Sequence, residues 1–71
     1  MKTHLIGSCG SLQQMAELIA KHFYWNEPAV LLDNKDNTWN IIFPAGSPKA
    51  GTLFKHLIVC KKKNRYRLER L

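Results

Sequence analysis

Cysteine is scarce in this sequence, and long apolar runs are absent. The 71 residues include two cysteines, Cys9 and Cys60, which are too few for a disulfide framework and favour a reducing compartment. The apolar run before Cys9 is only Leu5 and Ile6, far shorter than the core of a secretory signal. No run is long enough to span a membrane. We therefore expect a cytoplasmic protein with no membrane contact.

Acidic residues are also few, and the charge imbalance is local. Five Asp and Glu residues stand against eleven Lys and Arg residues, a formal net charge of +6. Residues 61–71 hold six of the eleven basic residues and one of the five acidic residues. Such a cluster of one sign can attract polyanions. The scattered carboxylates form no acid–base pair, and no Ser/His/Asp or Cys/His spacing suits catalysis. We expect no enzymatic activity and no cofactor.

The length of the chain predicts a single domain over residues 1–71. A hydrophobic content of 45% indicates a folded protein and argues against disorder. A chain this short buries only about 60% of the surface that its unfolded form exposes. Self-association as a homodimer would bury more apolar surface.

The most regular feature is a helical stripe over residues 11–25. Apolar side chains recur there at helical spacing, with polar residues on the opposite side. Ser11 and Gln14 match the reciprocal S-x-x-Q capping box. We expect the helix to end near Asn26 and Pro28. Asparagine can adopt the left-handed conformation that often ends a helix, and proline cannot continue one. The stripe consists of Leu12, Met15, Ala16, Ile19 and Phe23.

Three segments in the first part of the chain read as strands. Residues 2–8 form a short candidate before the helix. Residues 29–32 are fully apolar, so we expect that strand to be central or covered on both faces. Residues 38–43 should pair with it as a hairpin through the polar turn at 33–37. Alternation places Trp39, Ile41 and Phe43 on the face that the helix should cover.

Residues 52–62 allow two interpretations. As a strand, they would turn Leu53, Leu57 and Val59 inward. As a helix, they would follow Ser47 as N-cap and Pro48 as the first helical residue. The adjacent β-branched residues and the nearby glycine favour the strand.

The choice at residues 52–62 decides the predicted fold. With a strand there and a last strand over residues 65–71, the order is β-α-β-β-β-β: a small antiparallel sheet with one amphipathic helix packed on it. With a helix, the order becomes the ferredoxin-like β-α-β-β-α-β. Both are α+β folds, and we expect the first.

The main candidate site is the basic C-terminal segment. In an extended strand, Arg65 and Arg67 would share a face about 6–7 Å apart, close to the spacing of phosphates along a nucleic-acid strand. An exposed Tyr66 could stack on a base. One alternative is that these charges protect an edge strand from aggregation. Another is that they bind the acidic surface of a protein. The predicted polyanion contacts are Lys61, Lys62, Lys63, Arg65, Tyr66, Arg67 and Arg70.

A weaker candidate is the small-residue loop before the helix. Free backbone N–H groups at a helix start can bind an anion, and a cysteine there could act as a nucleophile. The segment lacks the glycine and lysine pattern of a phosphate loop. We also expect no metal site, because the histidines and cysteines do not have ligand spacing. The loop consists of Ser8, Cys9, Gly10 and Ser11.

The end of the predicted helix carries a third candidate. Tyr24 and Trp25 leave the apolar stripe, and exposed aromatic residues are favoured at protein interfaces. Trp25 could instead fold back over the hairpin and close the core.

These patterns predict a small basic binding module that associates with nucleic acid through its C-terminal Lys/Arg strand. The alternative is a protein-binding inhibitor or adaptor that docks through an exposed edge strand together with Tyr24 and Trp25. Small chains of this kind occur among accessory proteins of bacteria and mobile elements, an analogy that no motif supports.

Overall fold

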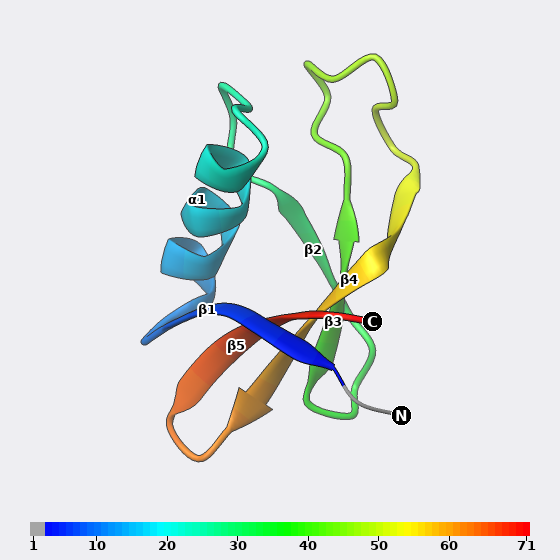
Figure 1. Cartoon of the computed structure of the whole chain (residues 1–71). Coiled ribbons are helices and arrows are strands. Elements are labelled where there is room, and N and C mark those ends of the chain that lie inside the picture. The colour runs from blue at the N-terminus through cyan, green and yellow to red at the C-terminus, as the bar shows by residue number, and fades with distance from the viewer. Residues whose placement is uncertain (1–2) are drawn as a thin grey trace.

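A computed structural model describes residues 3–71 as one helix and a five-stranded antiparallel sheet (Figure 1). The strands lie in the order β1-β5-β4-β3-β2. The predicted order β-α-β-β-β-β is confirmed, and the ferredoxin-like alternative is wrong because residues 53–62 are extended. Lys2, where the first strand was expected to begin, lies outside the described residues. The elements are β1 (His4–Cys9), α1 (Leu12–His22), β2 (Val30–Asp33), β3 (Thr38–Ile42), β4 (Leu53–Lys62) and β5 (Arg65–Arg70).

Helix α1 begins at the predicted cap. The Ser11 side chain accepts a hydrogen bond of 3.1 Å from the Gln14 backbone N–H. The Gln14 side chain reaches back to the backbone N–H of Gly10, one residue earlier than the capping box predicts. The first bond satisfies an N–H group that a helix start otherwise leaves unpaired, and the second pairs the N–H group of the residue before the cap.

The helix ends earlier than the stripe predicts. It stops at His22, and Tyr24, not Asn26, takes the left-handed conformation, with φ of 58°. The N–H groups of Tyr24 and Trp25 donate to the carbonyls of Lys21 and Ala20. This pair of bonds is the Schellman motif, which reverses the chain at a helix end.

Helix α1 packs on one face of the sheet, and the core lies between them (Figure 1). Trp39 and Ile41 are buried there, as alternation along β3 predicts. Hydrophobic burial of this kind contributes most of the stability of a small domain. The buried cluster consists of Cys9, Met15, Ile19, Ala29, Trp39, Ile41, Leu57, Val59 and Leu68.

The other face of the sheet is not covered by α1, and we call it the open face. Residues that oppose one another across antiparallel strands point to the same side, so the strand registers assign its members. They are Leu5 and Ser8 (β1), Val30 and Leu32 (β2), Thr38, Asn40 and Ile42 (β3), Leu53, Ile58, Cys60 and Lys62 (β4), and Arg65, Arg67 and Glu69 (β5).

The prediction that residues 29–32 form a covered strand is wrong. Strand β2 is the last strand of the sheet and pairs only with β3. Val30 and Leu32 point to the open face and are 49% and 54% exposed. An apolar run therefore marks a central strand only when both faces of the sheet are covered.

Strand β4 turns Leu57 and Val59 inward as predicted, but Leu53 is 41% exposed. The β3–β4 register is irregular between Trp39 and Ile41, so Ile41 lies opposite Phe54. Between the pairs Trp39–Val59 and Ile41–Phe54, β3 advances two residues and β4 advances five, and an odd surplus of three residues moves the following side chains of β4 to the other face. Phe54 therefore packs against the core in place of Leu53.

Candidate polyanion-binding site

The β4–β5 hairpin carries the basic C-terminal residues. Its strands are joined at Lys63 and Asn64, and Lys62 lies directly opposite Arg65. Lys63 has a φ of 56°, so it occupies the left-handed conformation that reverses the chain. This turn lies at the far end of the molecule from the loop that joins β3 to β4 (Figure 1).

Strand β5 is an interior strand, between β1 and β4. The suggestion that its charges protect a sheet edge from aggregation is therefore wrong, since the edges are β1 and β2. Pairing with β1 brings Ser8 directly opposite Arg67. The first and last strands of the chain thus build this region together.

The predicted contact residues separate onto two faces of the sheet. Arg65 and Arg67 share the open face with Lys62. Lys61 lies opposite Tyr66 on the helix side, and Arg70 belongs to that side as well. The seven residues therefore do not form one continuous strip.

A hollow of about 320 Å³ on the open face gathers four of the predicted basic side chains. The Arg65 guanidinium donates a hydrogen bond of 3.3 Å to the Ser8 hydroxyl. No carboxylate is among the described residues that line this hollow. We call it the basic hollow, and its lining residues are Ser8, Lys62, Lys63, Arg65 and Arg67.

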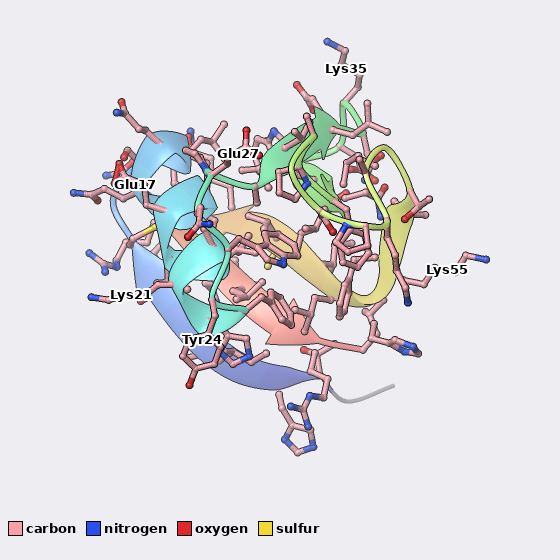
Figure 2. The ribbon with its side chains drawn as sticks, turned by 90° about the horizontal axis from the view of Figure 1, so that it is seen from above. Glu17, Lys21, Tyr24, Glu27, Lys35 and Lys55 are labelled. Atoms are coloured by element: carbon pink, nitrogen blue, oxygen red, sulfur yellow. The ribbon has the colours of Figure 1, made fainter. Side chains whose placement is uncertain are left out.

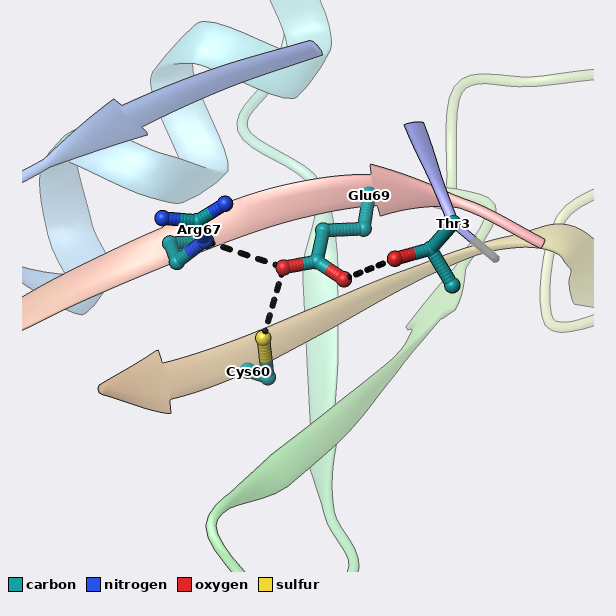
Figure 3. Close-up of polar contacts among 4 residues, drawn as sticks. All are labelled: Thr3, Cys60, Arg67 and Glu69. Atoms are coloured by element: carbon teal, nitrogen blue, oxygen red, sulfur yellow. Dashed lines mark hydrogen bonds and ion pairs between the residues drawn. The ribbon is translucent and has the colours of Figure 1, made fainter. Parts of the chain in front are cut away.

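Glu69 does not line the basic hollow but anchors Arg67, which does (Figure 3). Its side chain accepts bonds from Arg67 Nε at 3.0 Å, from the Thr3 hydroxyl at 2.5 Å and from the Cys60 thiol at 3.3 Å. Glu69 is only 7% exposed, so these donors replace the water that its charge loses. Because the ion pair uses Nε, Arg67 keeps two terminal NH₂ groups with no partner among residues 3–71.

The same contacts shift two titrating groups. The Thr3 hydroxyl, and after it Arg67 and Cys60, lowers the pKa of the Glu69 carboxyl, although burial acts in the opposite direction. Burial, and then the bond to Glu69, raises the pKa of the Cys60 thiol. Cys60 therefore stays protonated at neutral pH and serves as a donor, which is opposite to what a nucleophile requires.

Tyr66 is not placed to stack on a base at the basic hollow. Its ring packs edge-on against Trp39, with 5.4 Å between the ring centroids. The Lys61 ammonium lies 5.6 Å from the centre of the Tyr66 ring. Both side chains therefore contribute to a cation–π contact on the helix side of the sheet.

The loop before α1 uses its own polar groups. The Cys9 thiol is buried and donates to the carbonyl of Ser11 at 3.3 Å. The backbone N–H of Gly10 and the hydroxyl of Ser11 are both bonded to Gln14. Of this predicted anion loop, only Ser8 lines a hollow, and that hollow is the basic one.

The two aromatic residues after α1 point in different directions. Trp25 stacks on Phe23 at 5.1 Å and contacts Phe43 at 5.3 Å, so it closes the end of the core. Tyr24 is 93% exposed and points outward below the end of α1 (Figure 2). Of these two residues, Tyr24 is the one available as an exposed aromatic contact.

The sequence interpretation missed two roles. Glu69 anchors Arg67, a contact that the two-residue spacing along an extended strand could have indicated. Ser8 joins the basic hollow because β1 pairs with β5, and no local pattern carries that information.

The side chains that line the basic hollow are four cations and one hydroxyl, which suits a ligand rich in acceptors such as phosphate. Among residues 3–71, no three His, Cys, Asp or Glu side chains are grouped so that they could hold a metal ion. No helix in this part of the chain is long and apolar enough to cross a membrane. Comparisons with protein-family models, curated proteins and solved structures found no match to the chain.

Proposed function

We propose that this protein is a small, non-enzymatic module that binds nucleic acid through phosphate contacts at the basic hollow. One observation carries the proposal: four basic side chains and a serine hydroxyl surround a single hollow that no described carboxylate enters. Lysine, arginine and serine are the side chains that most often contact the nucleic-acid backbone. The two free cysteines and the reducing compartment that they favour agree with an intracellular partner.

The expected binding is electrostatic. Phosphate contacts release counterions from the nucleic acid, so affinity should fall as the salt concentration rises. Such contacts fix position without reading sequence, so we expect weak sequence preference. Lys61 and Arg70 lie on the other face of the sheet and contribute only to the long-range field.

A pair of matched double variants tests this function. Lys62→Gln/Arg65→Gln removes two charges from the basic hollow, and Lys61→Gln/Arg70→Gln removes two from the same hairpin on the other face. We expect the first pair to weaken binding of a short oligonucleotide at low salt by about tenfold or more, because two phosphate contacts are lost. The second pair should weaken it by less than about threefold, because only long-range attraction changes. Equal losses would show that net charge, and not the hollow, determines binding.

Tyr24 supports a second candidate function, docking onto a protein. A left-handed conformation is costly for a side chain other than glycine or asparagine, and such strain is often retained at functional positions. Tyr24 and Trp25 also border a hollow of about 270 Å³ together with Pro44 and Pro48. An inhibitor or adaptor would use Tyr24 as an aromatic anchor on its partner, which could include a second copy of this chain.

The variant Tyr24→Asn separates the two functions. Asparagine tolerates the left-handed backbone, so the fold should be kept while the aromatic ring is lost. If a protein partner captured from a nuclease-treated lysate is lost with Tyr24→Asn and kept with Lys62→Gln/Arg65→Gln, docking is the function. The proposed nucleic-acid function requires the reverse pattern with an oligonucleotide.

A further inference from the structure

We infer that the basic hollow takes two consecutive phosphodiester groups of a nucleic-acid strand and contacts no base. This inference rests on the proposed function and specifies its ligand. It follows from the spacing of the cations, from what borders them and from the absence of an aromatic ring among the lining residues.

The cations form two rows across neighbouring strands. Lys62 and Arg65 face each other across β4 and β5, and Ser8 and Arg67 face each other across β1 and β5. Alternate residues of one strand lie about 6–7 Å apart, so the two rows have that separation along the backbone. The hydrogen bond from the Arg65 guanidinium to the Ser8 hydroxyl joins the rows at one end. Successive phosphates of an extended strand have a similar separation. Each row therefore has the donors for one phosphate.

The two rows of cations do not continue along β5 or across the sheet. The next open-face residue along β5 is Glu69, whose buried carboxylate would repel a third phosphate. In the other direction the strand ends in the turn at Lys63 and Asn64, where Lys63 also lines the hollow and adds a cation beside the row of Lys62 and Arg65. The next open-face residues of β4 are Cys60 and Ile58, which carry no charge. Within residues 3–71, no basic residue continues the rows across the sheet.

Base recognition requires, beside the groups that hold the phosphates, an aromatic ring for stacking or polar side chains that the phosphates leave unused. The nearest aromatic residue in sequence, Tyr66, lies on the helix side and is packed against Trp39 and Lys61. Tyr24 is the most exposed large hydrophobic side chain of residues 3–71. It follows the C-terminal end of α1, whereas Ser8 precedes the N-terminal end of that helix. The ligand is therefore recognised through phosphodiester groups alone, which both single strands and duplexes present.

A length series tests the footprint. We would measure the dissociation constants of unphosphorylated oligothymidylates of two to eight nucleotides by calorimetry. The step from the dimer to the trimer supplies the second phosphate and should improve affinity by about tenfold, whereas each longer chain should gain only the statistical factor for its additional sites. The logarithmic salt slope should be close to about −1.4, the value for two phosphates of a single strand.

Two further measurements test whether bases contribute to binding and whether a single strand or a duplex is preferred. Oligoadenylates should bind within about twofold of oligothymidylates of the same length, since no stacking contributes. A duplex that can reach the hollow should show the same two-phosphate footprint. Its affinity relative to a single strand of the same length identifies which of the two forms of nucleic acid is preferred. Lys62→Gln/Arg65→Gln should abolish the gain between dimer and trimer, and Lys61→Gln/Arg70→Gln should preserve it.

The results that overturn the inference differ from those that overturn the proposed function. Affinity that keeps rising well beyond the statistical factor, a salt slope steeper than about −3, or a marked base preference would show a longer or base-reading site. In each case the protein would still bind nucleic acid. If no oligonucleotide of any length or strandedness binds even at low salt, both proposals are wrong.

Discussion

Glu69 is the one charged residue among residues 3–71 that the fold buries. A buried carboxylate is tolerated only when donors replace its lost hydration, and Thr3, Cys60 and Arg67 provide them. The three donors come from the beginning and the end of the chain. Glu69 therefore connects the residue before β1 with β4 and β5 and holds Arg67, which lines the basic hollow.

Removing the charge of Glu69 should destabilise the protein. Glu69→Gln keeps the shape of the side chain but removes the charge that pairs with Arg67 and replaces one acceptor oxygen by an NH₂ group, so we expect a loss of about 1–3 kcal/mol in the free energy of unfolding at pH 7. Urea denaturation measures this loss. Glu17→Gln, on the exposed surface of α1, is the control and should change stability by less than about 0.5 kcal/mol. Equal effects of the two variants would contradict a structural role for Glu69.

The contribution of Glu69 should depend on pH with a defined sign. Its pKa is lowered in the folded protein, so the unfolded chain binds the proton more readily. The stabilisation is complete well above the unfolded pKa of about 4.3 and is lost as the pH falls below it toward the folded pKa. The difference in unfolding free energy between wild type and Glu69→Gln should therefore narrow from pH 7 to pH 3. A difference that is constant or widens would be inconsistent with the lowered pKa.

Tyr24 offers the opposite prediction, a gain in stability. Glycine adopts a φ of 58° without steric cost, and the exposed tyrosine ring loses little packing when it is removed. Tyr24→Gly should raise the free energy of unfolding by about 0.5–1 kcal/mol. Thermal denaturation with His22→Gly as a control, which should instead destabilise the last turn of α1 by about 1 kcal/mol, checks the sign. Destabilisation by Tyr24→Gly would mean that the ring contributes to the fold.

At the scale of elements, local patterns predict most of the secondary structure. Periodicity and the cap locate the start of α1, and alternation identifies Trp39 and Ile41 as the buried side of β3. The position of β2 at the sheet edge and the outward turn of Leu53 could not be predicted. Both depend on which strands are neighbours and on an irregular register, and these are long-range properties.

The two faces of the β2–β3 hairpin should differ in their sensitivity to truncation. Ile41 is fully buried beneath α1, so Ile41→Ala should cost about 2–5 kcal/mol. Leu32 is 54% exposed on the open face, so Leu32→Ala should cost about 1 kcal/mol or less. Chemical denaturation of both variants measures the two losses in unfolding free energy. Similar losses would indicate that a second layer covers the open face, as in a self-associated form.

At the scale of the whole molecule, the candidate site depends on contacts between the two ends of the chain. The alternation of Arg65 and Arg67 on one face was predictable from an extended strand. The division of the seven predicted residues between two faces, and the arrival of Ser8 beside Arg67, follow from pairing of β5 with both β4 and β1. Sequence spacing alone contains no information about that pairing.

One measurement tests the proposed site most directly: a titration of the isotopically labelled protein with a short oligothymidylate, followed through backbone and side-chain NMR shifts. We predict that the largest changes occur at Ser8 and residues 62–67, around the basic hollow. Changes that centre instead on Tyr24 and Trp25, or that spread evenly over all exposed lysines and arginines, would contradict binding at the basic hollow.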